Sequence, residues 1–250
     1  MGVQWVTAFL DRRAAGRDAA AAFWARVTAG TLSPVRGVRG EFATVLPPDG
    51  EAYLRVQTVL EGPGGTHLDL HVPDVESAAR RAQTLGATAV PRDGYVALTS
   101  PAGLPWCLVP AAGAPRRPAP VEREGGHHSL LDQVCIDIPP DAFAAECAFW
   151  QEVTGWQLRP GSRPEFAYLV RPPGIAVRLL LQRLDDMPAD GRARAHPDLA
   201  CGDVPAEVAL HQTWGARVLG RFPHWTALSD PSGMPYCVTR RDPVTGTLPA

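Results

Sequence analysis

Three polar side chains alternate with aliphatic residues along one predicted strand, and their types suit acid–base chemistry. They are His67, Asp69 and His71. Because successive side chains of a strand point to opposite faces, all three share one face. A histidine beside a carboxylate can act as a general acid or base, since its pKa lies close to neutral pH. The pair returns later in the chain as His196 and Asp198. These five residues are the candidate catalytic groups; the alternative is that they only tie their strands to neighbouring loops.

The return of this pair is part of a longer repeat. An eleven-residue stretch occurs at 97–107 and again at 227–237, 130 residues further on, and six of its positions are identical. Phe23-Trp24 and Phe149-Trp150 match in the same way at a separation of 126 residues. Self-similarity over such a length at nearly constant spacing indicates a duplicated domain.

Both halves predict one order of elements, in which a strand, a helix and three strands occur twice. In the first half, strands are expected at 3–10, 41–46, 52–60, 66–72, 88–90, 95–99 and 106–109, and helices at 18–30 and 74–86. Asp18, Asp74 and Asp203 stand where helix N-caps are expected, because a short acidic side chain can accept from the first backbone N–H groups. The repeated Pro-x-Gly segments predict tight turns between the last two strands of each half.

Composition bounds the class of protein. A chain of 250 residues with 45% apolar and 20% charged residues is typical of a globular protein with a proper core. The expected domains are 1–110 and 127–241, joined by a Pro/Ala-rich linker at 111–126. A net charge of −2 argues against nucleic acid as a partner. We also expect no membrane span, and a cytoplasmic location, because five cysteines without paired spacing suit a reducing compartment.

The ordered set of motifs resembles the vicinal oxygen chelate (VOC) superfamily, in particular its glyoxalase-like and bleomycin-resistance-like branch. In the first half the resemblance is carried by Gln4, Phe23-Trp24, His67-Leu-Asp-Leu, Leu85-Gly-Ala and Ser100-Pro-Ala-Gly-Leu-Pro-Trp-Cys107, each with a counterpart in the second half. It implies an α+β fold of two tandem domains. Each domain would be a pair of βαβββ modules that form an open cupped sheet, with a small-molecule ligand inside the cup.

The resemblance also implies where a metal would bind. The slots that hold metal ligands in relatives correspond to Gln4, Gln57, His67 and Cys107 in the first half, and to Gln133, Gln182, His196 and Cys237 in the second. The carboxylates that relatives supply from the last strand of each module are therefore missing, and neutral amides are poor ligands for a hard divalent ion. Asp69 and Asp198 could add a carboxylate. We nevertheless expect no metal and no other cofactor, and the two cysteines can also be read as small core residues.

Several other side chains are candidates for ligand binding. The aromatic candidates are Trp5, Tyr95, Trp106, Trp225 and Tyr236, and the charged candidates are Arg55 and Arg178, on the strands that carry Gln57 and Gln182. Aromatic rings inside a cup could stack on a flat or hydrophobic ligand. The arginines could bind an anionic or carbonyl group if they point inward; otherwise they are solvated edge residues. His127 and His128 adjoin the linker and are expected to be exposed.

Three functions stay open. The first is a metal-independent enzyme of isomerase, lyase or cyclase type that acts on a small organic molecule in secondary metabolism. Under this hypothesis the first half is the better candidate for the active site, because Ala200 stands in the second half where the first has His71. The second is a resistance-type protein that sequesters an antibiotic or metabolite, and the third is a metal-dependent lyase or dioxygenase. We expect a monomer or a loose homodimer, because a fused pair of domains can make within one chain the contact that single-domain relatives make between chains.

Overall fold

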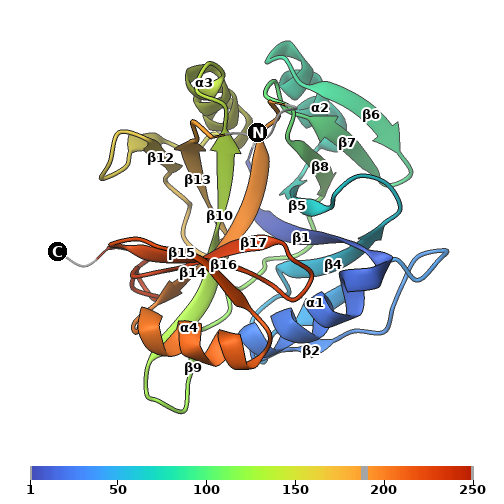
Figure 1. The fold of residues 1–250 in the computed structure, drawn as a ribbon. Helices are drawn as coiled ribbons and strands as arrows, with labels where there is room; N and C mark the ends of the chain where they lie inside the picture. Colours follow the sequence, from blue (N-terminus) through green and yellow to red (C-terminus); the bar gives the residue numbers. More distant parts are fainter. Residues whose placement is uncertain (1, 187–190, 249–250) are drawn as a thin grey trace. The chain divides into compact units, whose positions relative to one another are not determined.

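The computed structural model describes residues 2–186 and 191–248 (Figure 1). The described helices are α1 (Ala14–Val27), α2 (Val75–Thr84), α3 (Phe143–Thr154) and α4 (Val204–Thr213). The described strands are β1 (Trp5–Arg13), β2 (Thr31–Leu32), β3 (Phe42–Leu46), β4 (Leu54–Val59), β5 (Gly65–Val72), β6 (Thr88–Arg92), β7 (Tyr95–Thr99), β8 (Pro105–Pro110), β9 (Val121–Glu122), β10 (His128–Ile138), β11 (Leu158–Pro160), β12 (Phe166–Leu169), β13 (Arg178–Arg183), β14 (Arg194–Cys201), β15 (Arg217–Arg221), β16 (Trp225–Ser229) and β17 (Pro235–Thr239). Apart from β9, this is the βαβββ order four times over.

Two mixed sheets carry these modules, and their strand orders are the same. The first sheet runs β2-β3-β4-β1-β5-β8-β7-β6, and the second runs β11-β12-β13-β10-β14-β17-β16-β15, with β9 paired to β10. The pairs β5–β8 and β14–β17 are parallel, as expected when a helix connects strands of one module. The predicted α+β fold of duplicated βαβββ modules is confirmed.

Contacts between Cα atoms divide the chain into two compact units that do not follow the two halves of the sequence. Unit 1 contains Met1–Ala8, His67–Arg116 and Val134–Ala195, and unit 2 contains Phe9–Thr66, Arg117–Gln133 and His196–Ala250. Each unit therefore combines a module of the first half with a module of the second. The domain boundaries drawn along the sequence stay a prediction. The segment expected to be a linker includes β9, whose partners are His128 and Ser129.

The acidic caps of α2 and α4 form as expected. Asp74 accepts a hydrogen bond from the backbone N–H of Ser77 at 2.9 Å, and Asp203 accepts one from Ala206 at 3.0 Å. The expected cap of α1 is wrong, because this helix begins at Ala14 and Asp18 lies inside it, exposed and paired with Arg17. Ala14 and Ala15 are strong helix formers and lie before Asp18, so the helix begins closer to β1 than expected.

In unit 2 the core next to the helices is built around aromatic rings. Trp24 of α1 lies with its ring centroid 5.2 Å from that of Tyr236, in an edge-to-face arrangement, and donates from Nε1 to Asp230 at 3.0 Å. Tyr236 is fully buried. The prediction that it lines a ligand site is therefore wrong. On β17 it alternates with Cys237, so its ring points to the helix side of the sheet.

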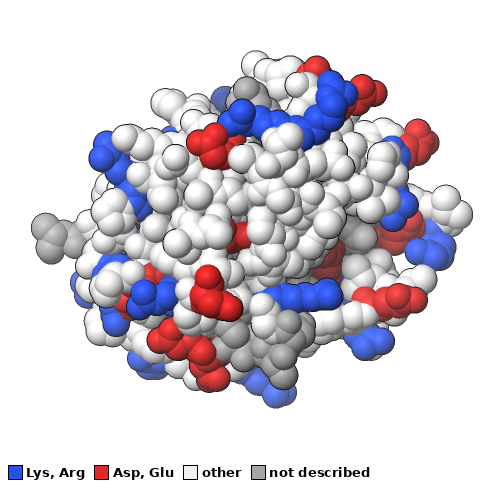
Figure 2. All heavy atoms as spheres, turned by 90° about the horizontal axis from the view of Figure 1, so that it is seen from above, with Lys and Arg blue, Asp and Glu red and all other residues white. Residues whose placement is uncertain are grey.

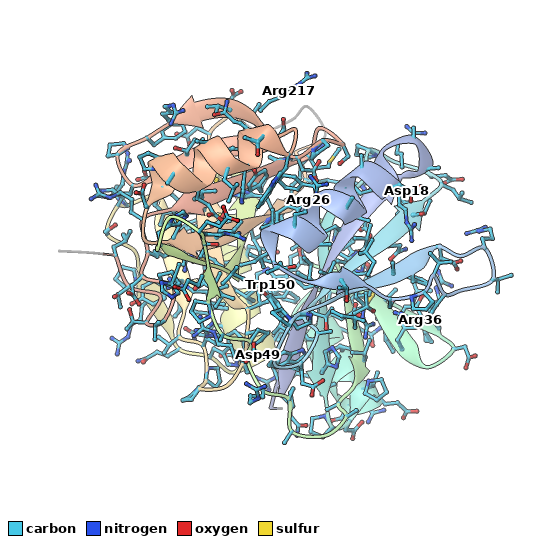
Figure 3. All side chains as sticks on the ribbon, turned by 90° about the horizontal axis from the view of Figure 1, so that it is seen from below. Asp18, Arg26, Arg36, Asp49, Trp150 and Arg217 are labelled. Carbon is cyan, nitrogen blue, oxygen red and sulfur yellow. The ribbon has the colours of Figure 1, made fainter. Side chains whose placement is uncertain are left out.

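Unit 1 has the corresponding core. Trp106 of β8 is 1% exposed, and its ring packs against Phe149 and Trp150 of α3 (Trp150 is labelled in Figure 3). The predicted ligand-binding role of Trp106 is wrong for the same reason of strand alternation, since its neighbour Cys107 occupies the other face. Glu146 of α3 accepts from Trp150 Nε1 and from the backbone N–H of Ala102, both at 2.9 Å.

The surface agrees with the modest net charge. In Figure 2 basic and acidic side chains lie near one another around the edge of the face in view, and its middle carries mostly other residues. None of the helices in the described part of the chain is long and apolar enough to cross a membrane.

Candidate functional site

In unit 1, His67, Asp69 and Cys107 come together as the alternation of β5 predicts. Nε2 of His67 lies 3.7 Å from Oδ1 of Asp69, and the two side chains are 11% and 8% exposed. Asp69 is paired with Cys107 of the parallel strand β8. Each of the three residues offers a ligand atom, and these atoms all lie within 4.8 Å of one another. Burial raises the pKa of the Cys107 thiol, although its hydrogen bond with His67 opposes this, so a metal would have to displace the thiol proton.

His71 continues this face of β5, but its bonded partner was not predicted. Its Nε2 lies 2.9 Å from the hydroxyl of Thr7 on β1. Thr7 stands 17 residues before Trp24, and Gln133 stands 17 residues before Trp150. Thr7, and not Gln4, is thus the counterpart of Gln133 by distance from the following helix.

In unit 2, the corresponding residues are joined by short contacts. Gln133 of β10 donates from Nε2 to Oδ2 of Asp198 at 2.5 Å. Nε2 of His196 lies 3.2 Å from Oδ1 of Asp198 and 3.6 Å from the sulfur of Cys237. Asp198 is paired with Cys237 of the parallel strand β17, as Asp69 is with Cys107. We call Gln133, His196, Asp198 and Cys237 the unit 2 cluster.

Two buried oxygens of the unit 2 cluster make no hydrogen bond with the described residues, although one of them, Oδ1 of Asp198, lies 3.2 Å from Nε2 of His196. Oε1 of Gln133 and Oδ1 of Asp198 accept no hydrogen bond from the described residues. Each of these two residues is only 2% exposed. Buried polar atoms are normally paired, because losing water without a new partner costs on the order of 1–3 kcal/mol. An unmatched pair of oxygens beside an imidazole and a thiol therefore indicates a place for a positively charged ligand.

The other ligand candidates of unit 1 lie on or beside β1, β7 and β13. Gln4 is exposed and precedes β1, whereas Trp5 is buried within β1. Gln182 of β13 accepts from the Cys135 thiol at 3.6 Å. Arg178 lies over the ring of Tyr168, with 5.1 Å between its Cζ and the ring centroid, and Tyr95 is 39% exposed. Their roles in ligand binding stay predictions.

In unit 2, Gln57 of β4 is paired with Phe42, and Arg55 lies over the ring of Phe9 at 5.5 Å. Trp225 stacks on Phe222, with ring centroids 4.7 Å apart and planes inclined by 17°. Trp225 therefore belongs to an aromatic pair, whereas Arg55 is held against a ring by a cation–π contact.

A second polar cluster of unit 2 was missed by sequence reasoning. Glu207 of α4 is completely buried and accepts hydrogen bonds from Arg123, His127 and His211 at 2.7, 2.9 and 3.1 Å. The expectation that His127 is exposed is therefore wrong, since its side chain is 10% exposed and bonded to this carboxylate. Arg123 donates hydrogen bonds to both carboxylate oxygens of Glu207, so we interpret these residues as a structural ion cluster.

Comparisons with known proteins agree with this architecture. A family model described as a glyoxalase-like domain matches residues 7–109 and 133–239. No match is found among curated proteins.

Solved structures share the fold over nearly the whole chain. The 2,3-dioxygenase LapB from Pseudomonas sp. KL28 is 14% identical with a TM-score of 0.64, over 96% of this chain and 92% of that one. A mutant of 4-hydroxymandelate synthase from Streptomyces coelicolor is 17% identical with a TM-score of 0.59, over 98% and 94%. A Mn(II)-bound glyoxalase from Novosphingobium aromaticivorans is 17% identical with a TM-score of 0.61, over 100% and 87%. At such identities the likeness shows the fold.

The prediction that no cofactor is bound is wrong. It rested on the missing carboxylates at Gln57, Cys107, Gln182 and Cys237. The structure instead brings carboxylates from β5 and β14 beside the histidines and thiols, as the group of His67, Asp69 and Cys107 shows. Such groups of ligand atoms could hold a metal ion, and this overturns the expectation.

Family membership follows from the repeated match and the fold. The family model covers most of both halves of the chain, and the two sheets repeat one strand order. The chain belongs to the glyoxalase-like domain family, within the VOC superfamily.

Proposed function

We propose that this protein is a divalent-metal-dependent enzyme that acts on a small organic molecule through the oxygen atoms of that molecule. The observation that carries the proposal is the unit 2 cluster, in which Oε1 of Gln133 and Oδ1 of Asp198 are buried and make no hydrogen bond with the described residues. A cation between these oxygens would remove the cost of leaving both unpaired.

The donor set of this cluster fits a metal. An imidazole nitrogen, a carboxylate oxygen, an amide oxygen and a sulfur are supplied by His196, Asp198, Gln133 and Cys237. A set that includes imidazole and thiolate favours zinc, iron or cobalt over magnesium or calcium. We therefore place a transition metal here, held by these four residues.

Unit 1 offers a smaller donor set. His67, Asp69 and Cys107 converge, but the residue that corresponds to Gln133 is Thr7, whose hydroxyl is bonded to His71. The proposal therefore favours the unit 2 cluster, in contrast to the sequence, which favoured the first half because it contains His71.

The protein side chains prepare the site in a definite way. Gln133 donates to Oδ2 of Asp198 and so directs Oδ1 of the same carboxylate towards His196 Nε2. A bound metal would act as a Lewis acid that polarises a carbonyl or hydroxyl oxygen of the substrate. Measuring oxygen uptake distinguishes dioxygenase chemistry from the lyase or isomerase chemistry expected from the sequence.

The cytoplasmic location of the protein stays a prediction.

Metal analysis of the purified protein tests the proposal. We expect about one transition-metal ion per chain, as in a site with a single set of His, Cys and carboxylate ligands. His196→Ala should lose this ion, and the matched variant His67→Ala should keep it, as measured by inductively coupled plasma mass spectrometry on samples of equal folded content. A metal-free wild type, or a His196→Ala variant with unchanged metal content, would contradict the proposal.

A further inference from the structure

A row of paired residues leads from the unit 2 cluster across the second sheet. Asp198 of β14 pairs with Cys237 of β17, Cys237 with Ala227 of β16, and Ala227 with Gly220 of β15. Residues paired in this way point to one face of a sheet, so Ala227 and Gly220 continue the face that carries the thiol and the carboxylate. The strands concerned follow one another in this order in the second sheet, and the four paired residues all belong to unit 2.

The far end of this row is closed by two aromatic rings. A Cβ placed on Gly220 would lie 3.1 Å from Cε2 and 3.3 Å from Cζ of Phe222, so the Phe222 ring covers the glycine on this face. Phe222 in turn stacks on Trp225 at 4.7 Å between centroids, and its backbone N–H donates to the carbonyl of Trp225 at 2.8 Å. Phe222 is 48% exposed, which leaves much of its surface available to a ligand.

The spacing between the thiol and the rings suits a small flat molecule. Neighbouring strands lie about 4.8 Å apart, so Gly220 and Cys237 are separated by roughly two such spacings. Between them in this row lies Ala227, whose side chain is a methyl group. A planar ring can lie over such small residues. A larger side chain in place of Ala227 or Gly220 would fill the space that the ring needs.

Unit 1 has a corresponding row of paired residues, but no glycine covered by an aromatic ring ends it. Asp69 pairs with Cys107, Cys107 with Ala97, and Ala97 with Val90. The branched side chain of Val90 stands where unit 2 has the ring-covered Gly220. The duplicated halves have thus diverged at the position that receives an aromatic ring in unit 2.

We propose that this face of unit 2 binds an aromatic or similarly planar small molecule that carries an oxygen group. The ring of the ligand lies over Ala227 and against Phe222 and Trp225, and its oxygen group points to Asp198 and Cys237. The oxygen end of this inference rests on the proposed metal function; the ring end rests on the row of small residues and the aromatic pair.

A pair of probes that differ only in planarity tests the inference. Benzoate and cyclohexanecarboxylate carry the same charged group, and benzamide and cyclohexanecarboxamide repeat the comparison without charge. We expect each aromatic probe to bind about three- to tenfold more tightly than its saturated partner, since contacts between aromatic rings add this much beyond area burial. Affinities would be measured by ligand-observed NMR titration of the full-length protein as purified.

Variants assign the preference to this face. Phe222→Leu removes a ring, and Gly220→Ala displaces the same ring without removing it, so both should bring the ratio of affinities close to one. Val90→Ala, at the matched place in unit 1, should leave the ratio unchanged. Melting temperatures and metal content of all three should match the wild type.

Each outcome supports or overturns the inference. Equal affinities for the planar and saturated probes in the wild type would overturn it, as would a preference that persists in both Phe222→Leu and Gly220→Ala. If the wild type holds no metal, the proposed function fails, and the benzamide pair still decides the binding of a ring. If the wild type holds metal but binds the planar and the saturated probes equally well, the inference fails and the proposed function stands.

Discussion

Replacing Asp198 with alanine is expected to lower the affinity for Co(II) by on the order of 100-fold or more. The carboxylate is the only negatively charged oxygen ligand of the unit 2 cluster, and its Oδ1 lies 3.2 Å from Nε2 of His196. Residues that merely support metal ligands change affinity by about 10- to 100-fold, so the loss of a ligand should reach or exceed the upper end of this range. Titration of metal-free protein with Co(II), followed by absorbance, measures the change.

Two further variants show whether the effect belongs to this cluster. Gln133→Leu removes both the amide oxygen and the hydrogen bond to Asp198, and should weaken Co(II) binding by about 10- to 100-fold. Asp69→Ala makes the same carboxylate-to-methyl change in unit 1 and should leave the affinity of the unit 2 cluster unaltered. A larger loss in Asp69→Ala than in Asp198→Ala would assign the metal to unit 1 and contradict the account.

Glu207→Gln is expected to destabilise the fold by about 3–5 kcal/mol, the usual effect of breaking a buried ion pair on one side. Glu207 is fully buried and bonded to Arg123, whose side chain is 7% exposed, so the variant leaves a buried guanidinium without its counter-charge. Total stabilities of domains lie near 5–15 kcal/mol, so the loss should be visible as a large fall of the urea midpoint. Glu124→Gln, an exposed neighbour of Arg123, should change stability by less than about 0.5 kcal/mol.

The same cluster sets a pH dependence. Burial alone would raise the pKa of Glu207, but the hydrogen bonds and charges of His211 and Arg123 hold it far below its usual range. Burial also lowers the pKa of His211, because the charged imidazole is disfavoured there. Both groups bind fewer protons in the folded state than in the unfolded chain. Their stabilisation is therefore complete above about pH 6.5 and is lost as the pH falls, first through the ordinary pKa of histidine and then through that of glutamate.

A double variant separates the charge effect from loss of packing. Arg123→Met combined with Glu207→Gln removes both charges, and should recover part of the stability lost in Glu207→Gln. The double variant should also have a weaker dependence on acid than the wild type. A single variant as stable as the wild type, or a double variant less stable than the sum of the two single changes, would contradict the role assigned to this ion cluster.

The repeated fold and half of the site were predictable because they depend on strand alternation. His67, Asp69, His196 and Asp198 lie on the expected faces, since period two alone decides which side of β5 and β14 they occupy. The same rule should have excluded Trp106 and Tyr236, because each is adjacent to a cysteine that points to the opposite face. Trp106 and Tyr236 were predicted to bind a ligand because they are aromatic. Their rings instead fill the cores between the sheets and the helices.

The parts that were missed depend on contacts between residues far apart in the sequence. Glu207 has a local signal, because it shares the buried face of α4 with Val204, Val208 and His211 at helical spacing. Its partner Arg123 lies 84 residues away, in a segment expected to be a linker. The pairing of Gln133 with Asp198 likewise spans 65 residues, and no spacing rule brings β10 and β14 together. Without these contacts, the missing family carboxylates argued against a metal.

Anomalous X-ray diffraction from crystals of the metal-containing protein tests the central claim most directly. Data collected on both sides of the absorption edge of the bound element locate the ion independently of any assumed ligand. We predict a peak bounded by Gln133 Oε1, His196 Nε2, Asp198 Oδ1 and the sulfur of Cys237. A peak found only beside His67, Asp69 and Cys107, or no peak at either cluster, would contradict the account.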